Sequence, residues 1–364
     1  MTEAVLLVGG RGTRLRPLTL DTPKPMLPVA GTPFLAHQLA RARGAGVRHL
    51  VLATWYQARV FEEYFGDGAA LGLELDYVTE ETPLGTGGAI RNVAERLRSG
   101  PDDPVLVLNG DILSGVDLGA LLDGHRARGA DVTLHLTRVE DPRAFGLVPT
   151  DAGGRVLAFL EKPSPEQLSA GSSAGAVTDQ VNAGCYVFRR SLIDEIPAGC
   201  VVSVERETFP GLLAAGARVH GVTDTSYWLD VGTPATFVRA SCDLVLGHAR
   251  SPLLPAAPGD ALVLPGARVA PDAKLTGGTT VGAGAEIGAR ALVEGSVVFD
   301  GAVVGEGAEV HRSAVGRGAV IGADSVLEGV TVGDRARIGP GNQLLGAERV
   351  WCDAAIPPGA IRFA

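Results

Sequence analysis

An apolar residue, nearly always aliphatic, recurs at every sixth position through most of the C-terminal third of the chain. The spacing is unbroken from Val263 to Phe299, and after one-residue slips it continues as far as Ile356. Glycine commonly follows the aliphatic residue. A hexad repeat of this kind predicts a parallel β-helix, in which each aliphatic side chain points inward and stacks on the next coil. We therefore expect residues 263–364 to form a hexapeptide-repeat left-handed β-helix. The sequence does not explain the slips.

The residues before the repeat have a different period. Strand-like and helix-like segments alternate from residue 32 to residue 247, which is typical of a parallel sheet with crossover helices. Residues 248–262 are rich in proline and have neither period, so they read as a linker. We predict an α/β chain, with a Rossmann-like, mostly parallel sheet in residues 1–247, a linker, and then the β-helix. A length of 364 residues is consistent with two globular domains.

Composition excludes several kinds of protein. The sequence has no run of eighteen apolar residues, and Met1 leads directly into a strand, so we expect no membrane span, no secretory signal and a cytoplasmic location. The four cysteines are scattered without the spacing of a metal site or a disulfide framework. A net charge of −9 argues against nucleic acid as a partner.

The first strand runs into glycines and then into positive charge. The apolar run 4–8 is followed by three glycines within residues 9–12, whose amide groups can approach an anion closely. Residues 11–24 hold four cations and one anion, a local balance of 4 − 1 = +3. This pattern predicts a polyphosphate-binding loop. A dinucleotide fingerprint is excluded because its third glycine would fall on Leu15, and a P-loop is excluded because no GK[ST] follows.

A second strand, VLVLNGD (105–111), ends in two polar residues. Ligands of open α/β sheets bind where strands end, so we expect Asn109 and Asp111 beside the glycine loop. A hard divalent cation on phosphate oxygens prefers one or two carboxylates, which makes Asp111 the best metal candidate in the sheet. A helix-capping or turn aspartate is the alternative. Asp230, shortly before Gly232, reads by itself as a turn residue.

At these motifs the chain resembles a known family. GGRGTRLRPLT (9–19) and PKP (23–25) match the signature of the sugar-1-phosphate nucleotidyltransferases, and the likeness runs through nearly the whole chain. PKPM and LNGD are most similar to the bacterial mannose-1-phosphate guanylyltransferases that carry a C-terminal hexapeptide-repeat domain. The resemblance implies Mg²⁺-assisted transfer of a nucleotidyl group from a nucleoside triphosphate, with GTP favoured, to a sugar 1-phosphate, with mannose 1-phosphate favoured. Pyrophosphate is the second product.

The resemblance also implies the site. Arg14, Lys24 and Asp111 correspond to catalytic residues, and Asp111 and Asp230 to the ligands of the metal ion. The implied nucleotide-binding residues are Leu6, Gly9, Gly10, Gly12, Thr13, Arg14, Lys24, Gly85, Gly87, Gly88 and Asn109. The implied sugar-phosphate-binding residues are Gly146, Glu161, Lys162 and Asn182. The base is expected to be bonded through main-chain groups of residues 6–10 and of the PLGTGG loop (83–88).

Several alternatives stay open. The Ser/Ala/Gly-rich segment 164–180 is longer than the family pattern and reads as an inert insertion or a flap, so a glucose or carbocyclic 1-phosphate is a possible substrate. A sister enzyme with another nucleotide and a catalytically silent regulatory homologue are further possibilities. A β-helix acyltransferase would need a base, for which His311 is the candidate, although we expect a solvent-exposed corner residue. We expect His135 to lie on the surface, and the β-helix to form a homo-oligomer.

Overall fold

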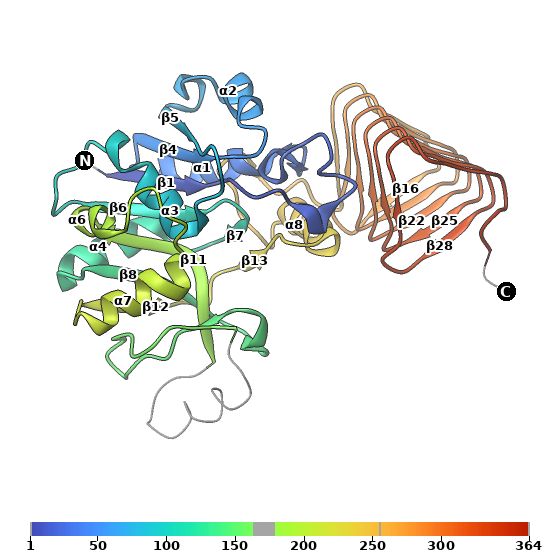
Figure 1. Cartoon of the computed structure of the whole chain (residues 1–364). Helices are drawn as coiled ribbons and strands as arrows, with labels where there is room; N and C mark the ends of the chain where they lie inside the picture. The colour runs from blue at the N-terminus through green and yellow to red at the C-terminus, as the bar shows by residue number, and fades with distance from the viewer. Residues whose placement is uncertain (1, 163–178, 255, 363–364) are drawn as a thin grey trace. The chain divides into compact units, whose positions relative to one another are not determined.

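The computed structural model describes residues 2–162, 179–254 and 256–362, so the insertion 164–180 lies almost wholly outside the described residues. The chain divides into two compact units (Figure 1). The first unit comprises Met1–Gly10 and Gln38–Trp228, and the second comprises Arg11–His37 and Leu229–Ala364. Residues 11–37 therefore belong with the C-terminal part of the chain. The domain boundaries at 247 and 263 stay predictions.

The first unit contains the predicted, mostly parallel sheet. Its strands lie in the order β12-β8-β11-β6-β1-β4-β5, and β9 and β10 join at β11. The β6-β1-β4-β5 part is parallel, whereas β11 runs antiparallel to β6 and β8. The strands of this unit are β1 (Glu3–Leu7), β4 (His49–Thr54), β5 (Glu74–Thr79), β6 (Pro104–Asn109), β7 (Ile112–Ser114), β8 (Val132–Arg138), β9 (Gly146–Leu147), β10 (Leu160–Glu161), β11 (Gln180–Arg189) and β12 (Val219–Thr223). The α/β class is confirmed.

Helices accompany this sheet, and both faces of its central strands are covered. Ala4, Val5 and Leu6 on successive positions of β1 are all fully buried, which is why the strand is an unbroken apolar run. The helical elements are α1 (Phe34–Gly44), α2 (Arg59–Phe65), η3 (Ala69–Leu71), α3 (Gly85–Asn92), η4 (Ala94–Arg96), α4 (Leu118–Arg128), η5 (Pro142–Ala144), α6 (Arg190–Glu195), η7 (Val204–Thr208) and α7 (Phe209–Ala214). No helix within the described residues is long and apolar enough to cross a membrane.

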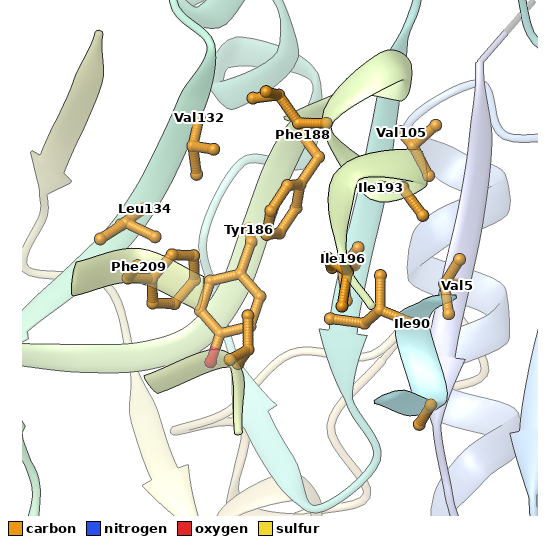
Figure 2. Close-up of a cluster of buried hydrophobic side chains, with 14 of the residues drawn as sticks. Val5, Ile90, Val105, Val132, Leu134, Tyr186, Phe188, Ile193, Ile196 and Phe209 are labelled. Atoms are coloured by element: carbon orange, nitrogen blue, oxygen red, sulfur yellow. The ribbon is translucent and has the colours of Figure 1, made fainter. Parts of the chain in front are cut away.

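Aromatic rings fill the core between β11 and α7 (Figure 2). Tyr186 and Phe188 both contact Phe209, with ring centroids 5.1 Å and 5.8 Å away, and all three side chains are fully buried. Aromatic pairs at such distances stabilise beyond their buried area. This packing fixes β11, the strand that carries Asn182.

His135 is buried, so the prediction of a surface histidine was wrong. Its strand, β8, lies between β11 and β12, and Thr133, His135 and Thr137 on one face are all buried. His135 Nε2 lies 3.1 Å from an Asp224 carboxylate oxygen, and burial lowers the pKa of His135. The polar alternation marks a hydrogen-bonded interior face of the sheet rather than a solvated one.

The second unit begins with the cationic segment of the signature and ends with the β-helix. The segment 11–37 contains η1 (Thr13–Leu15), η2 (Lys24–Met26) and the antiparallel pair β2 (Pro28–Val29) and β3 (Thr32–Pro33). β13 (Trp228–Asp230) leads into α8 (Pro234–Leu246). The side chains of Thr233 and Thr236 form a capping box at the start of α8, and Gly247 ends it in the left-handed conformation.

The strands of the β-helix repeat in threes, and each strand pairs in parallel with the third strand after it. The first sheet contains β14 (Ala261–Val263), β17 (Thr279–Val281), β20 (Val297–Val298), β23 (Ala314–Val315), β26 (Thr331–Val332) and β29 (Arg349–Val350). The second contains β15 (Arg268–Val269), β18 (Glu286–Ile287), β21 (Val303–Val304), β24 (Val320–Ile321), β27 (Arg337–Ile338) and β30 (Ala355–Ile356). The third contains β16 (Lys274–Thr276), β19 (Leu292–Glu294), β22 (Glu309–His311), β25 (Val326–Glu328) and β28 (Gln343–Leu345). The predicted parallel β-helix is confirmed, and the arrangement is consistent with a left-handed one.

The structure explains the slips in the hexad repeat. Each slip falls at the corner between the third sheet and the first, where Val293 is followed after five residues by Val298, which pairs with Val281. The prediction that Phe299 faces inward was therefore wrong. Phe299 instead packs on Phe237 of α8, with ring centroids 6.0 Å apart.

Buried hydroxyl groups close these shortened corners. Ser296 Oγ accepts a hydrogen bond from Ser313 N at 3.0 Å, and Ser313 Oγ accepts one from Val330 N at 2.9 Å. Both hydroxyls also donate to a carbonyl, Ser296 to Glu294 O and Ser313 to His311 O. The shorter corner therefore keeps the backbone amide bonded, so the register of the strands continues unchanged.

Candidate active site

Strand β1, which precedes the glycine loop, and strand β6, which leads into the LNGD motif, lie side by side in the first unit. Leu7 at the end of β1 pairs with Asn109 at the end of β6. Gly110 N donates to Leu7 O at 2.8 Å, and a methyl group at Gly110 would overlap that oxygen. Only glycine fits this position, so the backbone that presents Asp111 is held against β1. Leu6 is fully buried within β1.

A glutamine that the sequence reasoning missed holds the same turn. Gln38 Nε2, on α1, donates to Asn109 O at 3.1 Å and to Ile112 O at 2.8 Å. These two carbonyls lie on either side of Asp111, and Gln38 is only 3% exposed. Arg41, one turn further along α1, donates to Val116 O at 3.0 Å. The spacing of Gln38 and Arg41 on one helix face was visible in the sequence, but their target was not.

Two pairs of the predicted sugar-phosphate and nucleotide residues come together. Gly146 pairs with Glu161 between β9 and β10, and a methyl group at Gly146 would lie 3.0 Å from Glu161 Oε2. Asn109 and Asn182 meet at Gly184: an added methyl group there would lie 2.9 Å from Asn109 Nδ2, while Gly184 N donates to Asn182 Oδ1 at 3.0 Å. Gly184 has φ +73°, which favours glycine.

Asn182 and Gly146 are surrounded by aromatic residues that the sequence analysis did not name as site residues. Asn182 Nδ2 donates to the Tyr186 hydroxyl at 2.7 Å. Trp228 Nε1 donates to Ala183 O at 3.0 Å, and its ring lies edge-on to Phe145, with centroids 5.5 Å apart. The aromatic groups therefore fix the strand and the loop that frame Asn182 and Gly146.

Burial is the main influence on the Glu161 carboxylate. Burial raises the pKa of Glu161, the Glu205 carboxylate raises it further, and Lys162 and Arg206 oppose these effects. Lys162 itself is exposed, and its amide donates to Phe145 O at 3.0 Å. Burial disfavours the charged form of a carboxylate, so Glu161 is suited to bonding a neutral hydroxyl group.

Glu205 connects this region to the start of α3. It lies on the π-helical turn η7, and its Oε2 accepts hydrogen bonds from Thr86 Oγ1 at 2.7 Å and Ser203 Oγ at 2.8 Å. Single π turns occur frequently at functional sites. The sequence reasoning did not single out Glu205, because an acidic residue in a helical segment is ordinarily solvated.

The glycines of the PLGTGG loop pack against protein. The amides of Gly87 and Gly88 both donate to Val202 O, at 2.8 Å and 3.2 Å. A methyl group at Gly85 would lie 2.6 Å from the same carbonyl, and one at Gly88 would lie 2.6 Å from Cys200 O. The structure therefore gives these glycines a packing role, and their contact with a nucleotide stays a prediction.

In the second unit the cationic segment folds back on itself. Gly12 has φ +60°, and Thr19 Oγ1 donates to Gly12 O at 2.7 Å. A methyl group at Gly12 would lie 3.0 Å from Lys24 Cβ, so the glycine brings Lys24 close to the turn that begins at Thr13. Pro23 and Pro25 on either side of Lys24 are buried. Arg14, in contrast, is exposed.

Arg14 and Asp230 meet at a glycine although they are far apart in the sequence. A methyl group at Gly232 would lie 2.7 Å from Arg14 Nη2 and 2.9 Å from Asp230 Oδ1. The guanidinium group and the carboxylate therefore share one small space at the end of β13. Asp111 belongs to the first unit and Asp230 to the second, so their joint role as metal ligands stays a prediction.

The chemistry of these two aspartates fits a magnesium ion. Both side chains are half-buried, and Mg²⁺ is commonly bound by one or two carboxylates while phosphate oxygens and waters complete its shell. Within the described residues there is no group of three or more His, Cys, Asp or Glu side chains that could hold a metal ion.

His311 lies within strand β22, not at a corner as expected. Its Nδ1 lies 3.0 Å from Glu294 Oε2 and its Nε2 lies 3.4 Å from Glu309 Oε2, and the side chain is 16% exposed. Both ring nitrogens therefore face carboxylates of the same coil stack. This environment offers no argument for an acyltransferase base.

Comparisons with known proteins cover both parts of the chain. Residues 3–245 match the family model described as nucleotidyl transferase, and residues 257–347 match that of the GMPPB C-terminal domain. The mannose-1-phosphate guanylyltransferase of Mycobacterium tuberculosis is 59% identical over 269 residues, 74% of this chain and 71% of that protein. The mannose-1-phosphate guanylyltransferase catalytic subunit beta of Drosophila pseudoobscura pseudoobscura is 36% identical over 274 residues, 74% of this chain and 70% of that protein.

Solved structures resemble the chain over two thirds of its length. The crystal structure of HddC from Yersinia pseudotuberculosis in complex with GMP-PN has a TM-score of 0.55 and 25% identity, and covers 66% of this chain and 98% of that chain. A putative glucose-1-phosphate thymidylyltransferase from Bacillus anthracis has a TM-score of 0.57 and 19% identity, and covers 66% of this chain and 94% of that chain. The second likeness supports the fold alone.

Proposed function

Because this chain belongs to the nucleotidyl transferase family, we propose that it is an enzyme that converts GTP and mannose 1-phosphate into GDP-mannose and pyrophosphate. The observation that carries the proposal is the 59% identity, over 269 residues, to the mycobacterial mannose-1-phosphate guanylyltransferase. The match of residues 257–347 to the GMPPB C-terminal domain supports the same assignment. The GMP-PN bound to the similar HddC structure supports a nucleotide as ligand.

The chemistry asks the protein mainly to position and neutralise two polyanions. An oxygen of the sugar phosphate attacks the α-phosphorus of GTP in line, and pyrophosphate leaves. Each close pair of like charges repels by about 4 kcal/mol at an effective dielectric of 20, so several cations are needed. We assign Arg14 and Lys24 to the triphosphate and Lys162 to the sugar phosphate.

The remaining assignments concern the metal ion and the sugar. Asp111 and Asp230 would hold Mg²⁺, which supplies further positive charge to the phosphate groups. Glu161 and Asn182 would bond sugar hydroxyls, and Asn109 would contact the nucleotide. The partly buried carboxylate of Glu161 supports a ligand with hydroxyl groups on this side.

A substrate panel tests the proposal. Purified protein is given each of four nucleoside triphosphates with mannose 1-phosphate or glucose 1-phosphate, with and without Mg²⁺, and both pyrophosphate and the nucleotide sugar are measured. We expect the highest kcat/KM for GTP with mannose 1-phosphate, and turnover only with a divalent cation.

The other outcomes distinguish the alternatives. A preference for another nucleotide, or for a glucose or cyclitol 1-phosphate, would identify a sister enzyme. No pyrophosphate release with any pair would indicate a regulatory homologue. We further propose a homo-oligomer formed through the β-helix and a cytoplasmic location; light scattering of the purified protein tests the first, and fractionation of the source cells tests the second.

A further inference from the structure

The segment Arg11–His37 is anchored on α8 and on the start of the β-helix. The tip of its hairpin is held by a hydrogen bond from Ala30 N to Ser241 Oγ at 2.9 Å. At Gly31 an added methyl group would lie 2.8 Å from the Leu264 side chain. These contacts fix the hairpin formed by β2 and β3. They do not reach the part that carries Arg14 and Lys24.

A different coil of the β-helix contacts that part. Arg317, at the corner that follows β23, donates from Nη1 to Thr22 Oγ1 at 3.0 Å. At the stacked corner two coils later, Cys352 Sγ lies 3.9 Å from Pro17 O. The two corners thus contact both ends of the stretch 17–22, whose Pro17 and Leu18 are buried.

Arg317 departs from the pattern of its own corner. Asp300 and Asp334 occupy the same corner one coil before and one coil after Arg317. The Asp300 carboxylate accepts a hydrogen bond from Ala283 N at 2.8 Å, and the Asp334 carboxylate accepts one from Arg317 N at 2.8 Å. Arg317 is a donor and cannot make this bond to the amide of Asp300. Its guanidinium lies instead over the Phe299 ring, 5.8 Å from the centroid. Its Nη1 donates to Thr22 Oγ1 and lies a longer 3.9 Å from Asp334 Oδ2 of the next coil.

Thr22 is coupled to Lys24 through a stiff backbone. Only Pro23 separates the two residues, and Pro25 follows Lys24, so φ is fixed at both prolines. A displacement at Thr22 is therefore passed to Lys24 with little loss. The contact from Arg317 is only partly shielded, since the arginine side chain is 39% exposed.

We propose that Arg317 is a positioning residue for nucleotide binding: through Thr22 it holds Lys24 in place for the triphosphate. The β-helix then contributes to the binding of GTP, in addition to its proposed role in oligomerisation. The inference rests on the proposed function, because it assigns Lys24 to the nucleotide.

The test uses the full-length protein and a double-mutant cycle. Arg317→Ala and Thr22→Val each remove one partner, and Arg317→Asn removes the contact to Thr22 while restoring a side chain of the kind that stacks at this corner. We expect kcat/KM for GTP to fall about fivefold to twentyfold in each single variant, and the double variant to be no worse than the singles. The KM for mannose 1-phosphate and the melting temperature should change little. Arg290→Ala, which removes an ion pair confined to the β-helix, is the control.

Hydrogen exchange of peptides covering 13–22, measured without nucleotide, separates this inference from the proposed function. Exchange should accelerate about tenfold in both Arg317 variants and in Thr22→Val, and not in Arg290→Ala. Unchanged exchange, or losses that multiply in the double variant, would overturn the role of Arg317 even in an active enzyme. If the wild-type protein shows no GTP turnover but the variants show the expected exchange pattern, the proposed function is wrong. The role of the Arg317–Thr22 contact in ordering residues 13–22 would then still be supported.

Discussion

The sheet of the first unit and the β-helix of the second use strand ends differently, although both bury aliphatic side chains between parallel strands. In the β-helix, glycines after the strands abut the next coil: a methyl group at Gly305 would lie 2.7 Å from Ala323 N. In the sheet, Gly110 is held as closely against Leu7, but Asp111 follows it. A repeat needs its strand ends for stacking, whereas a sheet leaves them available for polar groups. The comparison indicates that functional side chains are found at strand ends that are not needed for stacking one coil on the next.

The largest effect is expected at the carboxyl end of β6. Asp111→Asn keeps the size of the side chain but removes the negative charge of the carboxylate that we propose as a metal ligand. We therefore expect kcat to fall by about 1,000-fold or more. The melting temperature should stay within a few degrees of the wild type, because Asp111 is only half-buried. Steady-state kinetics and thermal unfolding measure the two effects. Near-normal turnover in this variant would remove the metal assignment.

Removing the support of the same turn should have the next largest effect. Gln38→Met removes the side-chain donor that now bonds two partly buried carbonyls, Asn109 O and Ile112 O. We expect a loss of about 2 kcal/mol of unfolding free energy and at least a tenfold fall in kcat. Denaturant unfolding and kinetics are the measurements. A variant that loses stability but keeps full kcat would show that the turn does not need Gln38 for catalysis.

A buried carboxylate at the opposite, amino end of the strands should affect stability alone. Burial of Glu3 opposes its ionisation, but hydrogen bonds from His49, Ser99 and the backbone of Arg98 together lower the pKa of Glu3 from 4.5 to about 2. Its contribution is therefore complete above pH 4.5 and is lost as the pH falls toward 2.

Glu3→Gln should flatten the pH dependence of unfolding in that window, with a loss on the order of 2 kcal/mol at neutral pH and unchanged GTP kinetics. Urea unfolding from pH 2 to pH 7 measures it. Glu74→Gln, which removes a 59% exposed partner of Arg98, is the matched control and should have almost no effect. Equal pH curves for wild type and Glu3→Gln would contradict the assignment.

The smallest effect is expected in the β-helix. Ser313→Ala removes the hydroxyl that accepts from Val330 N and donates to His311 O at one of the shortened corners. The loss should be about 1–2 kcal/mol of stability, with no change in kinetics. A kinetic defect without a stability defect would mean that the corners do more than stack, and would weaken the contrast between the two regions.

The fold was largely predictable because its signals are local. The hexad period predicted the β-helix and most of its inward-facing residues, and the apolar runs predicted β1, β4 and β6. The spacing of the motifs also argued against a dinucleotide fingerprint and a P-loop, while the polyphosphate-binding role of the glycine loop stays a prediction. The misplaced residues show where local signals end. Val298 and Phe299 are adjacent in the sequence and both apolar. Only the pairing of Val298 with Val281 and Val315 of the adjacent coils shows that Val298, and not Phe299, points into the β-helix.

The sequence by itself determined the class of fold and the family. Periodicity and motif spacing depend only on residues that are close together in the chain, so they can be read without the structure. Tertiary structure alone decided that Gln38 holds the turn of Asp111, that Arg14 shares a space with Asp230, that His135 is buried, and that Arg317 reaches Thr22. These pairings join residues from tens to hundreds of positions apart. No local pattern specifies them, since hydrogen bonds and burial depend on which surfaces the folded chain brings together.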